Sequence, residues 1–178
     1  MPRLNVVETD AATGKVQELY EASQQEYGNV FNLFKGLANA PLALEAYMTL
    51  EKLIAEGKLS AAEQDVVRLA ASQFNGCEYC LAAHTMTAKM KGLSEEDVLK
   101  IRRGEPSDPK HAALVQFTHR VLDTKGFVSD EDINAFRAAG YSDEHIAEVT
   151  TILAQKTLSN YFNHIHDTPL DVPAPAEI

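Results

Sequence analysis

The chain has 178 residues, of which 45% are hydrophobic and 24% charged, and its formal net charge is -10 at pH 7. This composition is typical of a single globular domain and excludes a disordered or fibrous chain. The acidic surplus also argues against a nucleic-acid partner, because such partners are bound by clustered Lys and Arg side chains.

The amino terminus, MPRLNVVETD, lacks the apolar segment of a secretory signal. No run of residues approaches the ~18 apolar positions that a membrane span needs. We therefore expect a cytoplasmic protein that does not contact a membrane. In a reducing compartment, a closely spaced cysteine pair is more often redox-active or metal-binding than a permanent crosslink.

Helical punctuation recurs along the whole chain, and no segment shows the alternating pattern of a strand. Patterns of Ser followed three residues later by an acid predict helix starts at Ser60 with Glu63, Ser94 with Asp97, and Ser129 with Asp132. Glycines that can adopt the left-handed conformation predict helix ends at Gly57, Gly92, Gly104, Gly126 and Gly140.

These signals predict an all-α bundle of about nine helices with no sheet. The expected helices are 12–27, 30–38, 41–56, 60–74, 77–91, 94–103, 109–125, 130–139 and 143–165. We expect one domain over residues 1–178. Its last segment, 167–178, contains three prolines and is expected to run extended over a surface or a neighbouring subunit.

The only two cysteines of the chain lie in the stretch NGCEYCLAAH, residues 75–84. The Asn-Gly pair interrupts the preceding helix, so the cysteines begin a new one. At about 100° per residue, the side chains of Cys77, Cys80 and His84 fall within roughly a 60° arc of one helix face. Two thiols and an imidazole are therefore expected to lie close together.

This arrangement is suited to activated-cysteine chemistry. The unpaired N–H groups at a helix start favour a thiolate, which gives the advantage to Cys77. His84 lies one turn after Cys80 and can take its proton, which gives the advantage to that sulfur instead. The residues alone leave open which of the two cysteines attacks and which resolves.

Other uses of the cysteines are weaker. A disulfide closing so short a loop stabilises the fold by only about 2 kcal/mol. A structural zinc site needs four ligands, and the CxxCxxxH pattern supplies three, so a helical module holding a metal ion stays a second alternative. Haem attachment needs His directly after the second cysteine, where Leu81 stands.

The remaining histidines, His111, His119, His145, His164 and His166, are not expected to act at the site. The late stretch from Asn160 to His164 combines polar and aromatic residues in a helix that we expect to be buried. It is a candidate for lining the pocket.

The stretch DVVRLAASQFNGCEYCLAAH resembles the core motif of the alkyl hydroperoxidase D-like (AhpD-like) family, within the carboxymuconolactone decarboxylase superfamily. The motif has an acid twelve residues before the first cysteine, then Asn-Gly, then C-x-x-C-x-x-x-H, and Gly92 at the helix end. The likeness centres on residues 60–92. Weaker similarity in NVFNLFKGLANAPLALEAY and NYFNHIHDTPLD points to the peroxidase-related branch.

The resemblance implies an all-helical fold, assembly into trimers or hexamers, and thiol peroxidase (peroxiredoxin-type) or disulfide reductase activity without a metal or organic cofactor. In the family the second cysteine meets the hydroperoxide, with help from the histidine and the upstream acid. Carried over, Cys80 attacks, Cys77 resolves, and His84 with Asp65 manages protons. A dithiol reductant, such as a lipoyl group or a thioredoxin-like protein, then reduces the disulfide.

This sequence departs from the family pattern at two positions. The upstream acid is usually glutamate, whereas Asp65 is one methylene shorter, which raises the question of its reach to His84. Glu63 is an alternative proton-relay carboxylate, or simply a capping acid. Tyr79 stands where the best-characterised family type has a second histidine, which predicts a weaker relay.

Because the decarboxylase branch lacks the cysteine pair, thiol chemistry is expected over lactone decarboxylation. The alternative within thiol chemistry is a general disulfide reductase with negligible peroxidase activity.

Overall fold

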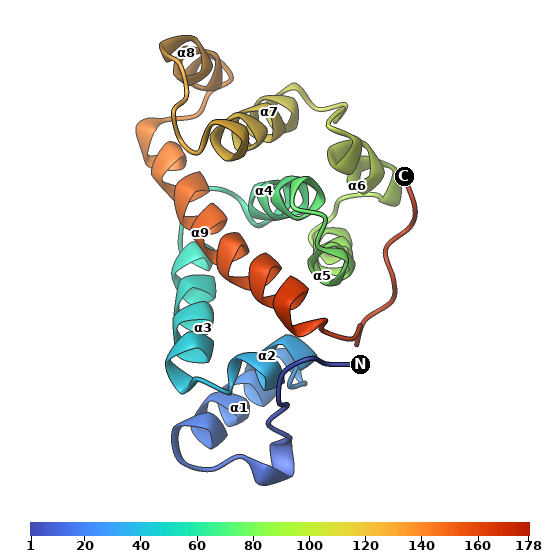
Figure 1. Ribbon diagram of the computed structural model, residues 1–178. Helices are drawn as coiled ribbons and strands as arrows, with labels where there is room; N and C mark the ends of the chain where they lie inside the picture. Colours follow the sequence, from blue (N-terminus) through green and yellow to red (C-terminus); the bar gives the residue numbers. More distant parts are fainter.

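Helix α4 lies at the centre of the fold and packs against α5, α6, α7 and α9. The computed structural model describes residues 1–178 and contains nine α-helices, a short 3₁₀ turn and no strand (Figure 1). The helices are α1 Gly14–Tyr27, α2 Asn32–Leu37, α3 Pro41–Ala55, α4 Ala61–Phe74, α5 Glu78–Met90, α6 Glu95–Arg103, α7 Pro109–Thr124, α8 Asp130–Ala138 and α9 Asp143–His166. The all-α fold predicted from the sequence is confirmed. None of these helices combines the length and the apolar character needed to cross a membrane.

The helix boundaries follow from the predicted caps. All three Ser-x-x-acid patterns form capping boxes, in which the Ser side chain and the acid each bond the other's backbone N–H. Four of the five glycines at helix ends have a positive φ, but Gly57 does not. At Gly57 a Cβ would lie 2.9 Å from the carboxylate of Glu148, which accepts hydrogen bonds from the N–H groups of Lys58 and Leu59. Gly57 is therefore needed because the Glu148 carboxylate approaches its backbone closely, and not because of a left-handed turn.

Two hydrophobic cores share the long helix α9, which crosses the molecule diagonally in Figure 1. The larger core has 19 buried residues, contributed mostly by α4, α7 and α9. The smaller has 13 and is built around α1, α2 and α3. Cys77, Tyr79 and Cys80 belong to the smaller core. The start of α5 therefore lies where the amino-terminal helices meet the rest of the bundle.

The segment after α9 runs extended over the protein's own surface toward α6 (Figure 1). The carboxylate of Asp171 accepts hydrogen bonds from the backbone N–H of Asn32 at 2.5 Å and from the hydroxyl of Tyr79 at 2.8 Å. Farther along, Arg102 donates to the carbonyl oxygen of Ala176 at 2.6 Å. The tail thus ties α2, α5 and α6 together beside the cysteine pair.

Candidate functional site around the cysteine pair

The cysteines are placed by the turn between α4 and α5. Gly76 adopts a φ of 68°, a left-handed conformation that favours glycine, and reverses the chain after Asn75. Cys77 is the residue that precedes the first turn of α5, and Cys80 lies within that turn. Both thiols are free, and the residues are only 1% and 2% exposed. The two sulfur atoms are therefore almost fully enclosed by the protein.

Helix α9 supplies the polar groups that touch the sulfur atoms. The side-chain nitrogen of Asn163 lies 3.3 Å from Sγ of Cys80 and 3.8 Å from Sγ of Cys77. The hydroxyl oxygen of Ser159 lies 3.8 Å from Sγ of Cys80. One turn away, Asn160 accepts a hydrogen bond from Asn75 at 2.9 Å. The late polar stretch that the sequence marked as a candidate thus lies directly against the cysteine pair.

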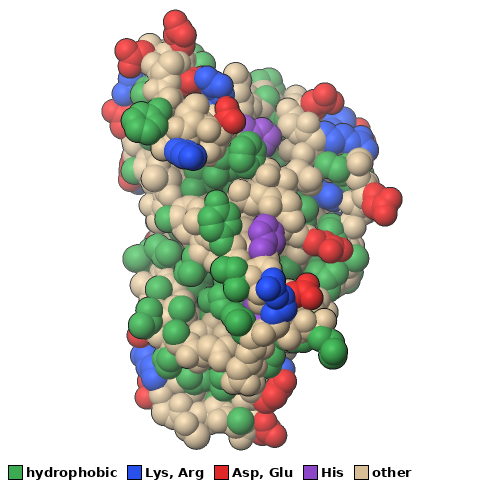
Figure 2. Space-filling model, in the orientation of Figure 1, with side chains coloured by type: hydrophobic (Ala, Val, Ile, Leu, Met, Phe, Trp, Pro, Cys, Tyr) green, Lys and Arg blue, Asp and Glu red, His purple; other side chains and the backbone are tan.

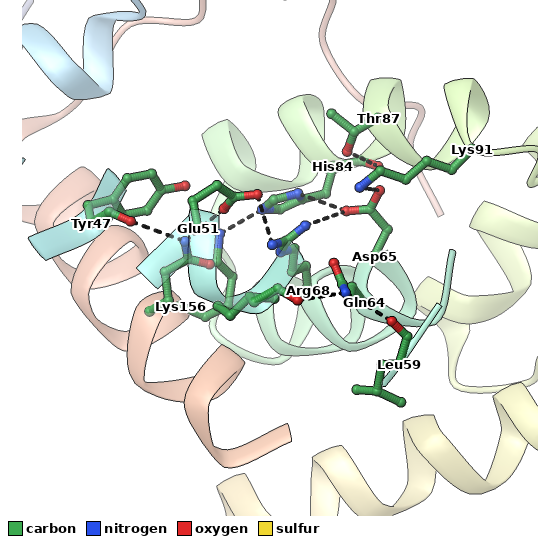
Figure 3. A network of polar contacts seen from close by, with 12 residues as sticks. Tyr47, Glu51, Leu59, Gln64, Asp65, Arg68, His84, Thr87, Lys91 and Lys156 are labelled. Atoms are coloured by element: carbon green, nitrogen blue, oxygen red, sulfur yellow. Dashed lines mark hydrogen bonds and ion pairs between the residues drawn. The ribbon is translucent and has the colours of Figure 1, made fainter. Parts of the chain in front are cut away.

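His84 does not stand alone beside the thiols. Its Nε2 lies 2.6 Å from Nζ of Lys156, and its Nδ1 lies 3.4 Å from Oδ1 of Asp65. All three residues are buried. Asp65 therefore reaches His84 despite its shorter side chain, and a lysine from α9 occupies the other nitrogen of the ring. Figure 3 shows this line from Lys156 through the imidazole to the carboxylate.

The line belongs to a larger buried ionic cluster (Figure 3). Arg68 donates to Glu51 at 2.8 Å and to Asp65 at 3.4 Å. Lys91 pairs with the second oxygen of Asp65 at 2.9 Å, whereas no carboxylate lies within 4.0 Å of Lys156. The cluster contains three cationic side chains and two carboxylates. A single further negative charge would balance it.

The cysteines are electrostatically unequal. A hydrogen bond from Cys77, together with the Lys156 ammonium, His84 and Ser159, lowers the pKa of Cys80 well below its ordinary value although burial opposes this. The same hydrogen bond and burial raise the pKa of Cys77. These shifts favour a thiolate at Cys80 over one at Cys77. The side chain of Cys77 makes no capping contact with the helix N–H groups.

The same ionic cluster shifts the pKa values of His84 and Asp65. Burial and the Lys156 ammonium lower the pKa of His84, with Asp65 acting in the opposite sense. Burial would raise the pKa of Asp65, but His84, Arg68 and Lys91 outweigh it and hold that pKa well below its ordinary value. A neutral imidazole between an ammonium and a carboxylate accepts at Nε2 and donates from Nδ1.

The structure separates the second candidate carboxylate from the site. Glu63 accepts from the backbone of Ser60 at 2.9 Å and from the hydroxyl of Tyr141 at 3.0 Å, and pairs with Lys110. It makes no contact with His84. Glu63 is thus the capping acid of α4, and Asp65 is the carboxylate beside the imidazole.

No group of three or more His, Cys, Asp or Glu side chains is arranged to hold a metal ion. The CxxCxxxH alternative also requires His84 to turn a ring nitrogen toward the sulfurs. Both nitrogens face other residues instead, namely Lys156 and Asp65. The residues present do not fit a metal centre.

A cavity of about 310 Å³ opens beside the imidazole. Its walls are largely aromatic, from Tyr27, Phe31, Phe34, Tyr47 and Tyr79. His84, Glu51, Arg68 and Lys91 also line it and supply its polar side. We call this space the aromatic cavity; its apolar walls lie next to the ionic cluster.

Comparison with known proteins agrees with the resemblance seen in the cysteine motif. The model of the carboxymuconolactone decarboxylase family matches residues 41–117, which include the cysteine motif and most of the ionic cluster. Within this range the chain is similar to the carboxymuconolactone decarboxylase family. It is also similar to the uncharacterized protein YdfG of Bacillus subtilis (strain 168), with 25% identity over 120 residues, 65% of this chain and 81% of the relative.

Solved structures with the AhpD-like fold superpose over nearly the whole chain. The AhpD core of an uncharacterized peroxidase-related protein from Ralstonia eutropha JMP134 matches with a TM-score of 0.87 and 23% identity, covering 96% of this chain and 92% of its own. The debrominase Bmp8, crystallised as its C82A variant with 2,3,4-tribromopyrrole, matches with a TM-score of 0.77 and 17% identity over 96% and 94% of the two chains. The fold is shared by proteins of different chemistry, so function has to be argued from the site.

Proposed function

We propose that this protein is a thiol-dependent hydroperoxidase in which Cys80 is the attacking sulfur. The observation that carries the proposal is the charge balance of the buried cluster. Arg68, Lys91 and Lys156 outnumber the two carboxylates by one positive charge, and a Cys80 thiolate supplies the missing negative charge. Burying an unpaired cation is costly, so the cluster favours the ionised sulfur.

The reaction begins with the Cys80 thiolate and the terminal oxygen of a hydroperoxide. An S–O bond forms as the O–O bond breaks, which oxidises the sulfur to a sulfenic acid and releases an alkoxide. The buried Lys156 ammonium, whose charge favours the Cys80 thiolate, gives its proton to the alkoxide, so an alcohol leaves. The cluster loses the thiolate and the ammonium charge together and stays balanced.

Cys77 completes the oxidative half of the reaction. Its thiol attacks the sulfenic sulfur of Cys80, a disulfide forms, and the hydroxyl group leaves with the thiol proton as water. Asn163 contacts both sulfur atoms and keeps them together. An external dithiol, such as a lipoyl group or a thioredoxin-like protein, returns two electrons and two protons and regenerates the thiols.

His84 and Asp65 serve this chemistry by positioning. Nε2 of His84 holds the Lys156 amine, and Asp65 fixes the imidazole from the other side. This differs from a relay in which the histidine itself deprotonates the cysteine. It also accounts for a site that works with Tyr79 in place of a second histidine, because the lysine provides the acid.

We also propose that the chain forms a homo-oligomer, a trimer or a hexamer. Hydrophobic side chains gather over α3 and α9 on the face shown in Figure 2, while acidic side chains lie mostly toward its edges. Exposed apolar residues of these helices include Leu42, Leu53, Tyr161 and Ile165. Burial of this surface between subunits would remove it from water.

Stopped-flow oxidation tests the proposed activity. Reduced protein is mixed with cumene hydroperoxide, and free thiols are counted before and after one equivalent. We expect a rate roughly a hundredfold or more above that of free cysteine, which corresponds to about 3 kcal/mol of barrier. Cys80→Ser should abolish the reaction, whereas Cys77→Ser should stop at the sulfenic acid.

Oxidation no faster than that of an unactivated thiol would refute the peroxidase proposal. If the same protein still reduced small disulfides rapidly, the function would be that of a general disulfide reductase. The lowered pKa of Cys80 favours this second activity too, because the thiolate is the reactive form in disulfide exchange.

A further inference from the structure

We propose that the reducing thiol attacks Cys77, not Cys80, and that it enters by a second cavity separated from the aromatic cavity by Tyr79. The inference rests on the proposed function, because it concerns the disulfide that the proposed reaction forms. It assigns an entrance to the reductant.

The second cavity lies between the start of α5, the end of α9 and the tail. It has a volume of about 340 Å³, and its lining includes Cys77, Asn163 and Thr168 but not Cys80. The aromatic cavity includes His84 but neither cysteine. Tyr79 lines both spaces. From this side, Cys77 is the sulfur that an incoming molecule meets.

The leaving group also favours attack at Cys77. A thiolate that attacks Cys77 forms a new S–S bond and breaks the internal one, so the electron pair goes to Cys80. Asn163 and Ser159 contact the sulfur of Cys80, and the Lys156 ammonium on the same helix favours its negative charge. Attack at Cys80 would place the charge on Cys77, whose only polar side-chain partner outside the pair is the Asn163 amide, at 3.8 Å. Exchange is faster when the more stable thiolate leaves.

A second exchange step then releases the oxidised reductant and restores both cysteines. The second thiol of the reductant attacks its own sulfur in the mixed disulfide on Cys77. The reductant departs as a disulfide, Cys77 is released and takes a proton, and Cys80 remains a thiolate with Lys156 protonated again. Two electrons and two protons have passed to the protein.

The depth and the charge of the second cavity determine which thiols can reach Cys77. Cys77 is 1% exposed, so its sulfur lies at the bottom of the cavity and cannot be met by a thiol fixed on a convex protein surface. A slender thiol, free or carried on a flexible chain, can reach it. Glu78 and Asp167 line the cavity, and no Lys or Arg does. Asp167 is partly neutralised by the terminal amine 3.6 Å away. A neutral or cationic thiol is therefore preferred over an anionic one.

Trapping the mixed disulfide tests the site of attack. The internal disulfide is made with diamide, so the experiment does not depend on hydroperoxidase activity. After a brief reaction with 2-mercaptoethanol, the protein is quenched with acid, alkylated and cleaved after Glu78, which separates the two cysteines. We expect the mercaptoethanol adduct on Cys77 and the alkyl group on Cys80. The adduct on Cys80 would overturn the proposal.

Rates of reduction test the entrance. His164 lines the second cavity and is exposed, and we expect His164→Trp to slow reduction by 2-mercaptoethanol roughly tenfold. Phe127→Trp is the control, because Phe127 is exposed between α7 and α8 and lines neither cavity. Far-ultraviolet circular dichroism confirms that both variants are folded. Equal rates in the two variants would refute entry through this cavity.

Varying the charge of the reducing thiol provides an independent test of the second cavity. Cysteamine, 2-mercaptoethanol and 2-mercaptoethanesulfonate carry positive, neutral and negative groups on chains of similar length. At equal thiolate concentration we expect reduction rates to fall in that order, and the order to weaken in Glu78→Gln. The reverse order would refute the proposed cavity. A protein that diamide oxidises but hydroperoxide does not would refute the proposed function and leave this inference standing.

Discussion

Lys156 of α9 places its amine 2.6 Å from Nε2 of His84, although 72 residues separate them in the sequence. The lysine is only 1% exposed, and no carboxylate lies within ion-pair distance of it. Burial lowers the pKa of Lys156, whereas the sulfur of Cys80 acts in the opposite sense, so the ammonium form depends on a thiolate at Cys80. The relationship makes the lysine, more than the histidine, the counterion of the cysteine.

Replacing Lys156 with Met should raise the pKa of the Cys80 thiol by more than about one unit, where one unit corresponds to about 1.4 kcal/mol. The reason is that Met fills a similar volume but cannot stabilise the thiolate. Ultraviolet absorbance of the thiolate as a function of pH measures the shift. Lys52→Met, at an exposed position of α3, is the control and should change nothing. An unchanged titration midpoint in Lys156→Met would contradict the assigned counterion.

The tautomer of His84 is a second consequence of the same contact. The lysine ammonium can only donate, so Nε2 must be unprotonated and the ring proton must lie on Nδ1, facing Asp65. Nitrogen NMR of labelled protein near neutral pH should show this tautomer. In Lys156→Met the pKa of His84 should rise, because a lowering influence of the neighbouring cation is lost. A ring protonated on Nε2 in the native protein would rule out the contact.

Asp65 should make stability depend on pH in the acid range. Its folded-state pKa is held below the ordinary value of about 3.9, so its contribution is complete above the unfolded-state pKa and is lost as pH falls toward the folded-state pKa. Asp65→Asn should remove this part of the pH dependence. At neutral pH it should lower the free energy of unfolding by about 3–5 kcal/mol, because Arg68 and Lys91 lose a buried partner.

Urea unfolding between acid and neutral pH measures both effects of Asp65→Asn. Asp123→Asn is the matched control, because Asp123 is an exposed residue of α7 without an ion pair. If the two variants showed the same stability profile, Asp65 would not be the anchor of the cluster.

The helices were predictable because their signals are local. A Ser cap and an acid three residues later act within one turn, and all three such patterns start helices where the sequence places them. The placement of Cys77, Cys80 and His84 on one helix was predictable for the same reason, because the Asn-Gly pair before them marks a helix start. Gly57 shows the limit of this reasoning. Its role depends on Glu148, which lies on a helix remote in sequence.

The rest of the site is assembled by tertiary packing. Glu51 comes from α3, and Lys156 and Asn163 come from α9, so no local spacing connects them to the cysteines. The sequence did contain one signal for this part of the site. Lys156 falls in register with Val149, Ile152 and Leu153 on the buried stripe of α9, where a lysine is rare unless it is paired. A charged residue on an apolar stripe can thus mark a site before the structure is known.

Tyr79 joins the cysteine helix to the tail, and its removal should loosen that tail. Its hydroxyl donates to Asp171 at 2.8 Å and accepts from the backbone N–H of Leu33 at 3.3 Å. Burial and the carboxylate raise the pKa of Tyr79, so the phenol stays protonated and remains a donor. Tyr79→Phe removes both hydrogen bonds and leaves the ring in place. Because the acceptor is charged, the free energy of unfolding should fall by about 1.5–3 kcal/mol.

Hydrogen exchange should show where the effect of Tyr79→Phe is felt. We expect faster exchange at the amide of Asn32, which donates to Asp171, and faster proteolysis within residues 167–178. Tyr161→Phe is the control, because that tyrosine is exposed and its hydroxyl makes no hydrogen bond within the protein. If Tyr79→Phe left exchange at Asn32 and cleavage of the tail unchanged, the tail would be held by contacts other than this hydroxyl. Tyr79 would then be a wall between the two cavities and nothing more.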